Sequence, residues 1–350
     1  MDLEPLVARA RERMGQPAFD YIVGGAEDER TLRDNEDAWH RLRLRPRVLR
    51  DVGSVDASTT LLDRATPTPI MVAPTAMHRL AHVDGEQGSA AAAAQVGAVF
   101  VAATMATQSL ESVARVAPGA RRWFQLYVHR DRGMTRDLVD RAADTGFEAL
   151  VVTVDAPVPG IRRRDRANGF ELPEDLELAN VRASLNSDSG GAMDEYSDAA
   201  LEPGLTFDDL AWLAALRDLP LFVKGVLRAD DAAACIEAGA SGVIVSNHGG
   251  RQVDGAVSTV DALREIAPRL DAGAELYVDG GVRSGTAVAA ALALGARGVL
   301  VGRPVIWGLA AGGRDGAAAV LTELHEELER AMTLLGAPTV ADLSPDLVAT

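Results

Sequence analysis

Apolar and polar positions alternate along most of the chain in a pattern typical of parallel β/α proteins. From about residue 69 onward, short apolar runs ending in Gly, Pro, Asp or Asn are followed by alanine-rich or amphipathic segments of helical length. Eight such runs predict an α/β fold, a (β/α)8 TIM barrel, whose chemistry lies on loops at the carboxyl ends of the strands. An open doubly wound sheet is the alternative. The predicted strands are 69–73, 98–102, 123–127, 149–154, 221–224, 242–246, 275–279 and 298–302.

The pattern predicts one domain over residues 1–350. An N-terminal helical segment, 1–68, precedes the barrel, 69–350. Within that first segment, Pro17 is placed to open a helix, and the glycine pair at 24–25 to end it.

A long insertion, 160–206, separates the fourth and fifth predicted strands. It follows the carboxyl end of a strand, so we expect an active-site loop. Its middle, 186–198, is small and polar, which favours a mobile loop or lid over a second domain.

Composition narrows the functional classes. The 350 residues carry 35 Lys+Arg against 51 Asp+Glu, and this net charge of −16 disfavours nucleic acid as a partner. A hydrophobic share of 47% excludes disorder of the whole chain. The single cysteine, Cys235, excludes an intramolecular disulfide, a thiolate-held iron–sulfur cluster and a multi-cysteine zinc site. We therefore expect no metal and a reducing cytoplasm.

Targeting and membrane segments are not expected. The N-terminus mixes acidic and basic residues and lacks the apolar core of a secretory signal. The alanine-rich stretches around 89–102 and 286–301 are interrupted by glycine and polar residues, so each is interpreted as a helix plus a strand. The prediction is a soluble protein without a membrane partner.

Polar side chains stand at five of the predicted strand ends. A single polar residue at a strand end needs no function, because strand ends often meet water. Seven polar side chains that converge on one barrel mouth, however, favour a functional site there. They are Gln125, Tyr127, Thr153, Asp155, Lys224, His248 and Asp279.

Two loops combine glycine with arginine after the seventh and eighth predicted strands. Residues 278–285 read VDGGVRSG and residues 301–304 read VGRP. Glycine lets backbone N–H groups approach an anion, a helix N-terminus adds a favourable dipole, and Arg283 or Arg303 supplies bidentate hydrogen bonds. Tight turns alone also need glycine. Because the phosphate site of many barrels lies at these two loops, the pair predicts a phosphate-bearing ligand.

The segment 245–252, VSNHGGRQ, carries the strongest candidate for a base. His248 can take a proton near neutral pH, and Arg251 offers a fixed cation able to grip a carboxylate. A structurally hydrogen-bonded histidine is the plain alternative. Asp155, at another strand end, could orient and stabilise the imidazolium. Most of the arginine block at 162–166 is interpreted as a solvated turn, of which one member facing the mouth would suffice to bind an anion.

Other strand ends suggest contacts to a flat ring. Pro74, Thr75 and Ala76 can offer backbone groups to the edge of a heteroaromatic ring, and neighbouring strands add an amide and a hydroxyl. Lys224 lies in the predicted barrel interior, where an unpaired cation is costly, so it needs an anionic or electron-rich partner. Pairing with a structural carboxylate is the alternative for this lysine.

These residues make the chain resemble the FMN-dependent α-hydroxy-acid oxidising enzymes, the group of glycolate oxidase, lactate oxidase and mandelate dehydrogenase. The resemblance covers nearly the whole chain, and SNHGGRQ together with DGGVRSG is highly specific. It rests on DYIVGGAED (20–28), APTAMHRLAHVDGE (73–86), WFQLYVHRDR (123–132), TVDAPVPGIRRR (153–164), VKGV (223–226), VSNHGGRQ (245–252), DGGVRSG (279–285) and VGRP (301–304).

The resemblance implies FMN as cofactor and oxidation of an L-2-hydroxy acid to a 2-oxo acid by an (S)-2-hydroxy-acid oxidase or dehydrogenase. The implied catalytic residues are His248 as base, Asp155, Tyr127, Arg251 and Lys224. The implied substrate-binding residues are Tyr21, Arg162, Arg251, Tyr127 and Met105. The implied FMN-binding residues are Pro74, Thr75, Ala76, Gln125, Thr153, Lys224, Ser246, Asp279, Gly281, Arg283, Gly302 and Arg303.

The substrate pocket departs from the family pattern. Where glycolate oxidase has Ser-Ser-Trp, this chain has Ala103-Thr104-Met105, so a flexible thioether replaces a rigid indole. Ile161 replaces a commonly basic neighbour of Arg162, and Pro159 stiffens the approach. Met105 predicts room for an aromatic or medium-chain substrate such as mandelate.

Several alternatives stay open at this level. One is an FMN barrel of another class, such as an isomerase, and another is a non-catalytic flavin-binding sensor. Oxygen is the expected reoxidant, with a quinone or protein acceptor, or a monooxygenase outcome, as alternatives. The proton reaches His248 either from the α-carbon or from the hydroxyl. The resemblance also implies a homo-oligomer, a tetramer or an octamer.

Overall fold

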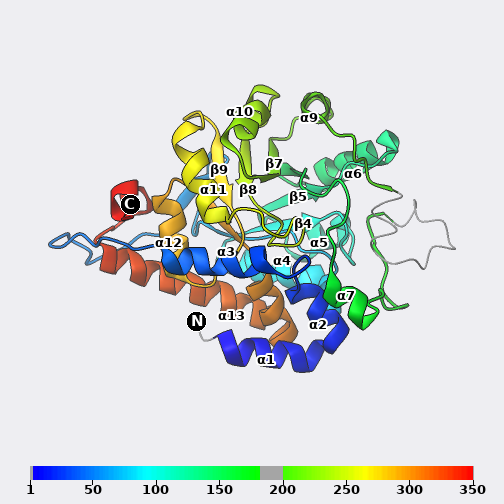
Figure 1. Ribbon diagram of the computed structural model, residues 1–350, viewed down its shortest axis with the longest axis horizontal. Coiled ribbons are helices and arrows are strands. Elements are labelled where there is room, and N and C mark those ends of the chain that lie inside the picture. The colour runs from blue at the N-terminus through cyan, green and yellow to red at the C-terminus, as the bar shows by residue number, and fades with distance from the viewer. Residues whose placement is uncertain (1–2, 182–199, 350) are drawn as a thin grey trace.

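Eight parallel strands close into a barrel in the computed structural model, which describes residues 3–181 and 200–349 (Figure 1). Around the barrel the order is β10-β3-β4-β5-β6-β7-β8-β9, so the TIM barrel is confirmed and the open doubly wound sheet is excluded. Each strand falls within two residues of its predicted range. The strands are β3 (Ile70–Val72), β4 (Val99–Ala103), β5 (Arg122–Leu126), β6 (Ala149–Thr153), β7 (Leu221–Val226), β8 (Gly242–Val245), β9 (Glu275–Val278) and β10 (Gly298–Val301).

The barrel interior is packed with side chains, because alternate residues of each strand point inward. Three aromatic rings fill its centre: Trp123 stacks on Phe222 with centroids 4.7 Å apart, and Tyr277 meets both rings edge-on. The barrel interior below the mouth is therefore filled, and among the described residues the barrel itself leaves space for a ligand at the carboxyl ends of its strands.

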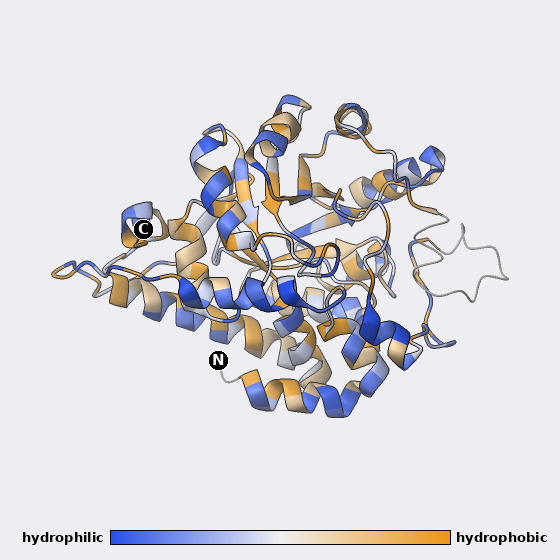
Figure 2. Cartoon of the chain, in the orientation of Figure 1, coloured by the Kyte–Doolittle hydropathy of each residue, from blue (hydrophilic) through white to orange (hydrophobic). Residues whose placement is uncertain are grey.

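Helices surround the barrel, with hydrophilic residues along their outer faces and hydrophobic residues in the strands (Figures 1 and 2). The last helix departs from helical geometry at Gly312 and Gly313 and begins directly beside the barrel mouth. The surrounding helices are α4 (Gly85–Val96), α5 (Leu110–Val116), α6 (Arg132–Asp144), α9 (Phe207–Ala214), α10 (Ala229–Glu237), α11 (Thr259–Ile266), α12 (Gly285–Ala293) and α13 (Arg303–Leu335). Short 3₁₀ turns lie at His78–Leu80, Ala267–Arg269, Val340–Asp342 and Pro345–Leu347.

The N-terminal segment is helical only in its first part. The helices are α1 (Leu3–Met14), α2 (Gln16–Val23) and α3 (Arg30–Arg41), and Pro17 and Gly24 lie at the two ends of α2 as predicted. The expectation of a purely helical segment needs a correction, because β1 (Thr59–Leu61) and β2 (Arg64–Thr66) form an antiparallel hairpin. Its Leu61 is fully buried against the interior residues, so the hairpin closes the amino end of the barrel.

The insertion after β6 is partly described. It contains a short helix, α7 (Arg163–Asn168), and returns at Leu201, which bridges to His129 beyond β5. The predicted mobile loop at 186–198 lies outside the described residues. Within the described residues, no helix is long and apolar enough to cross a membrane.

Candidate active site

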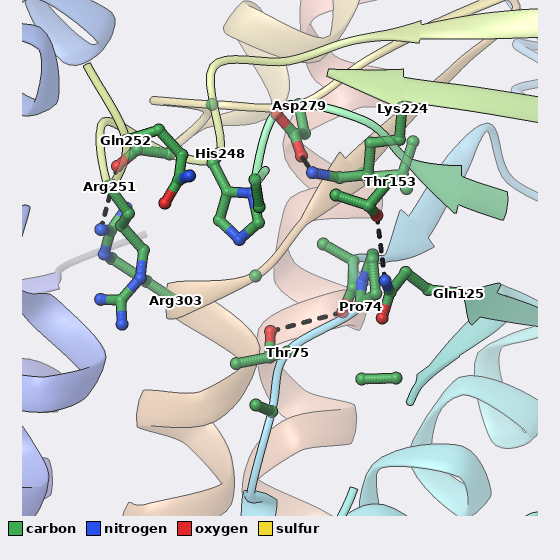
Figure 3. A pocket seen from close by; sticks show the side chains of 18 of the residues that line it. Pro74, Thr75, Gln125, Thr153, Lys224, His248, Arg251, Gln252, Asp279 and Arg303 are labelled. Atoms are coloured by element: carbon green, nitrogen blue, oxygen red, sulfur yellow. Dashed lines mark hydrogen bonds and ion pairs between the residues drawn. The ribbon is translucent and has the colours of Figure 1, made fainter. Parts of the chain in front are cut away.

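A cavity opens at the carboxyl ends of the barrel strands, with about 1270 Å³ of empty space counting the part that opens to solvent. Figure 3 shows the imidazole of His248 between Arg251 and Arg303 on one side and Lys224 with Asp279 on the other. Most of the predicted site residues line this cavity. They are Tyr21, Pro74, Thr75, Ala76, Met105, Gln125, Tyr127, Thr153, Arg162, Lys224, His248, Arg251, Asp279, Gly281, Arg283, Gly302 and Arg303, whereas Asp155 and Ser246 lie behind it.

His248 and Asp155 form a hydrogen-bonded pair beside the cavity. Nδ1 of His248 lies 2.8 Å from Oδ1 of Asp155. A carboxylate only accepts, so Nδ1 carries the proton and Nε2 keeps a free lone pair on the cavity side. Burial lowers the pKa of His248 below its usual value, although the charge of Asp155 opposes this shift. Burial would raise the pKa of Asp155, but His248 and Lys224 together bring it below its usual value.

The turn after β8 aims the imidazole. His248 has φ +59, which an L-residue rarely adopts, and it is followed by two glycines with positive φ. Gly250 could not carry a side chain, because a Cβ there would come within 2.6 Å of the backbone nitrogen of Leu32. Ser246 holds the turn from behind: its Oγ accepts the backbone N–H of His248 at 3.0 Å. Ser246 is fully buried and does not line the cavity, so in this structure it contacts the site through His248 and Lys224.

Tyr127 follows β5 and faces the base. Its hydroxyl lies 3.4 Å from Nε2 of His248. Burial, aided by the charge of Asp155, raises the pKa of Tyr127, so the phenol stays protonated and can donate a hydrogen bond. A substrate oxygen placed between them could accept a hydrogen bond from the hydroxyl of Tyr127 while Nε2 of His248 acts as a proton acceptor.

Two arginines gather around Tyr21, which comes from α2 outside the barrel. The guanidinium carbons of Arg251 and Arg162 lie 4.9 Å and 5.9 Å from the centre of the Tyr21 ring. The ring of Tyr21 also stacks on Phe170, with the ring centroids 4.5 Å apart. Arg251 donates to the carbonyl oxygens of Tyr21 and Gly24, at the C-terminal end of α2. Burial, followed by the charge of Arg162, lowers the pKa of Arg251 to about 10.

The rest of the arginine block lies away from the mouth, as expected. Arg164 pairs with Glu29 at 2.6 Å, and Arg163 pairs with Asp28. These ion pairs attach α7 to the turn between α2 and α3. Arg162 is thus the member of the block that faces the cavity.

Lys224, on β7, has a buried partner. Its Nζ lies 3.1 Å from Oδ2 of Asp279 and donates to Oγ of Ser246 at 2.9 Å. Burial would lower the pKa of Lys224, but Asp279 and Asp155 together raise it, so the cation persists. Among the described residues, Oδ1 of Asp279 is buried without a hydrogen-bond partner. This orphaned acceptor lines a cavity and is suited to a ligand hydroxyl.

Cations and glycines gather at the end of the cavity formed by the loops after β9 and β10. Gly281 has φ +74, and a Cβ there would lie 2.2 Å from the carbonyl oxygen of Asn35. Arg283 pairs with Glu36 at 2.7 Å, whereas Arg303 donates to the carbonyl oxygens of Ile22, Gly24 and Gly249. Burial, then the charges of Arg251 and Arg283, lowers the pKa of Arg303 to about 9. This mutual repulsion is relieved by an anion such as a phosphate.

The opposite wall of the cavity is suited to a flat polar ring. Thr75 follows β3, and Gln125 donates through Nε2 to Oγ1 of Thr153 at 3.0 Å. Oε1 of Gln125 accepts the backbone N–H of Thr104, which fixes the orientation of the amide and leaves its second N–H for a ligand.

Sequence reasoning missed several lining residues. Gln252 donates to the carbonyl oxygens of Asp155 and Val158 and accepts from the backbone of Gly160, so it joins the loops after β6 and β8. It stands in the VSNHGGRQ motif, which was the available signal. Leu201 also lines the cavity, and no local pattern marks it. Tyr21 was found only through the resemblance.

The site has three parts: His248 with Asp155 and two nearby arginines, the buried Lys224–Asp279 pair, and the cationic, glycine-rich loops after β9 and β10. The residues fit FMN, because the orphaned Oδ1 of Asp279 suits a ribityl hydroxyl and the arginine-rich end suits its phosphate. Within residues 3–181 and 200–349, no cluster of three metal-ligating side chains is found. The fold and site define a barrel enzyme that holds a phosphate-bearing flavin beside a carboxylate substrate.

Comparison with known proteins identifies the family. The profile of the FMN-dependent dehydrogenase family matches residues 10–350, and the chain belongs to this family, whose cofactor is FMN. The chain is 47% identical over 342 residues to L-lactate oxidase of Nostoc sp., covering 95% of this chain and 94% of that protein. It is 43% identical over 348 residues to human 2-hydroxyacid oxidase 1, covering 97% and 94%. The crystal structure of mandelate oxidase with (S)-4-hydroxymandelic acid aligns with a TM-score of 0.93 at 41% identity, covering 99% and 98%.

Proposed function

We propose that this protein is an (S)-2-hydroxy-acid oxidase, which converts an L-2-hydroxy acid to the 2-oxo acid and passes two electrons to FMN and then to oxygen. The observation that carries the proposal is the unprotonated Nε2 of His248, which lies 3.4 Å from the hydroxyl of Tyr127 in a cavity that two arginines also line. A base, a hydroxyl donor and a carboxylate grip are the groups that oxidation of a 2-hydroxy acid requires.

Each residue has a distinct task in this proposal. Arg251, with Arg162 and Tyr21, binds the substrate carboxylate and orients the α-carbon. Tyr127 hydrogen-bonds the substrate hydroxyl, and Nε2 of His248 takes one proton, from the α-carbon or from the hydroxyl. Bound FMN supplies the two-electron acceptor, held at Lys224 and at the phosphate end of the cavity.

Asp155 is proposed to act chiefly in the transition state. His248 becomes positively charged as it takes the proton, and a buried carboxylate 2.8 Å away stabilises that charge. An FMN barrel of another class, or a flavin-binding sensor, is not favoured, because the relatives reported above are hydroxy-acid oxidases and a sensor has no need of a base.

The test is anaerobic mixing of the yellow protein with lactate, glycolate, mandelate and longer 2-hydroxy acids. We expect the flavin absorbance to bleach within the turnover time, and hydrogen peroxide to form when oxygen is admitted. A flavin that no hydroxy acid bleaches would refute the proposed function. Bleaching without peroxide would retain the hydroxy-acid chemistry and replace oxygen by another acceptor.

An aromatic or medium-chain substrate such as mandelate is proposed from apolar residues that line the cavity. Met105, Ala156, Pro159 and Leu201 are among them, and the flexible thioether of Met105 leaves more room than an indole would. In a substrate panel, mandelate or 2-hydroxyhexanoate should give a higher kcat/KM than glycolate, and Met105→Trp should reverse that order. Glycolate as the best substrate of the parent would contradict this part of the proposal.

Assembly and location complete the proposal. Val48 and Leu49 are exposed by 79% and 102%, and Arg47 beside them is hydrogen-bonded to the backbone of Leu335 at the end of α13, next to the exposed Leu334. Such an exposed apolar patch supports a homo-oligomer, a tetramer or an octamer, and light scattering would measure the oligomeric state.

The proposed location of the protein is the cytoplasm, in line with its single cysteine.

A further inference from the structure

A second cavity adjoins the active site. It lies between the outer side of β6 and β7 and the helices α9 and α10, with about 1170 Å³ of empty space counting the part that opens to solvent. Two of its lining residues are Val152 and Val223, which belong to the outer core cluster and not to the barrel interior. It is therefore separate from the flavin cavity, which lies over the barrel mouth.

The two cavities share part of their walls. Tyr127, Thr153, Ala156 and Leu201 line both. Of these, Ala156 and Leu201 are two of the apolar residues proposed above to accept the substrate side chain. The second cavity thus adjoins the part of the active site that these two residues line.

The lining of the second cavity selects the kind of group it can hold. Valine, leucine and proline side chains dominate it, together with Phe207 and the thiol of Cys235. No lysine, arginine or histidine lines it among the described residues, while Glu202, Asp209 and Asp231 do. A carboxylate would be repelled there, whereas an alkyl chain would be accepted.

The thiol is part of this apolar wall and has no chemical role in it. Burial raises the pKa of Cys235 to about 12, so at neutral pH it is a neutral thiol that packs like a small apolar side chain.

We propose that the second cavity is a subsite for the alkyl chain of medium- and long-chain 2-hydroxy acids, which passes Leu201 while the carboxylate stays at Arg251. This inference rests on the proposed hydroxy-acid oxidation and extends it to the substrate class. Short acids such as lactate end before Leu201 and do not reach the subsite. Each further methylene that enters the subsite should raise kcat/KM about fourfold, the factor that corresponds to burying one CH₂ group.

The test compares lactate with (S)-2-hydroxyoctanoate in the FMN-loaded parent and in two variants that fill the second cavity. Cys235→Phe fills it from α10, and Leu205→Trp fills it from a half-buried loop position that tolerates a larger side chain. Neither residue lines the active-site cavity. Cys235→Ala is the matched control, which changes the same position without filling the space.

In the parent, the octanoate derivative should exceed lactate in kcat/KM. Both filling variants should lower the ratio of the two values at least tenfold while lactate stays within about twofold, and the alanine control should keep the parent ratio. Binding of the 2-oxo-acid products provides a readout besides turnover, measured from the perturbed flavin absorbance. The filling variants should raise the dissociation constant of 2-oxooctanoate and leave that of pyruvate near the parent value.

Two results would overturn the subsite: a parent that gains nothing between lactate and the octanoate derivative, or a ratio that both filling variants leave unchanged. In either case lactate would still bleach the flavin, so the proposed function would stand. A protein that no 2-hydroxy acid reduces would instead remove both proposals.

Discussion

His248 combines three constraints: a left-handed backbone, a bond from Nδ1 to Asp155, and an Nε2 that faces the cavity. His248→Gln keeps a polar side chain of similar size but cannot take a proton. The variant should bind FMN and stay yellow, while anaerobic flavin reduction by the best substrate slows by about 10²–10⁴-fold. Stopped-flow absorbance measures this rate, and reduction at the parent rate would remove His248 from the chemistry.

Asp155 opposes the burial that lowers the pKa of His248, so its removal has a defined sign. In Asp155→Asn the pKa of His248 falls further, and the acid limb of the pH profile of kcat/KM should move to lower pH. The turnover number should fall at the same time, because the imidazolium formed in the reaction loses its counter-charge. The exposed Asp230→Asn is the matched control and should change neither quantity. A limb that moves to higher pH would contradict this assignment.

At the scale of elements, α3 joins two loops of the active site. Nδ2 of Asn35 donates to Oδ1 of Asn247 at 2.7 Å, and Nδ2 of Asn247 donates back to Oδ1 of Asn35 at 2.8 Å. Asn247 directly precedes His248, and the carbonyl of Asn35 packs against Gly281 in the loop after β9. This buried amide pair thus connects the proposed base and the proposed phosphate loop through a helix outside the barrel.

Asn35→Ala leaves the amide of Asn247 buried with fewer partners. We expect a loss of about 1–3 kcal/mol in the free energy of unfolding and a weaker affinity for FMN. Urea unfolding and flavin fluorescence measure the two effects. The neighbouring Asp34→Ala is the control, because Asp34 is exposed and its ion pair with Arg41 is worth little. An Asn35→Ala protein as stable as that control would show that the pair does not brace the site.

At the scale of the whole molecule, the net charge of −16 contrasts with a cationic cavity. The acidic residues dominate the surface, whereas Arg251, Arg283 and Arg303 lie close enough that Arg303 is destabilised by the other two. The net charge of the chain therefore says little about the ligand. The cluster of arginines in the cavity, which departs from that net charge, indicates an anionic ligand.

Removal of FMN should therefore leave repelling charges in the core. The apoprotein should unfold at a lower temperature than the holoenzyme, and millimolar inorganic phosphate should restore part of the loss by mass action. Sodium chloride at the same ionic strength is the control and should restore less, since screening alone is weak at buried sites. In Arg303→Met the effect of phosphate should disappear. A phosphate effect equal to that of chloride would place the phosphate site elsewhere.

Much of the fold could be predicted from local patterns. The strands are short apolar runs that must be buried on both sides, so hydropathy alone located each of them within two residues. The β1–β2 hairpin was missed, because a three-residue strand such as Thr59–Leu61 is too short to show a period, and only its contact with the barrel interior stabilises it. The sequence also located the glycine- and arginine-bearing loops after β9 and β10, which line the cavity, whereas their phosphate role stays a prediction.

The sequence by itself determined the order of strands and helices, the glycine-rich loops after β9 and β10, and the His248–Arg251 motif, since each depends on neighbours in the chain. The tertiary structure decided which distant groups meet: Asp155 with His248, Asp279 with Lys224, and Tyr21 of α2 with the two arginines. It also decided that Ser246 supports the site from behind, and that a second cavity borders the first. These depend on closure of the barrel, which brings together residues far apart in the sequence, and no local pattern records such distances.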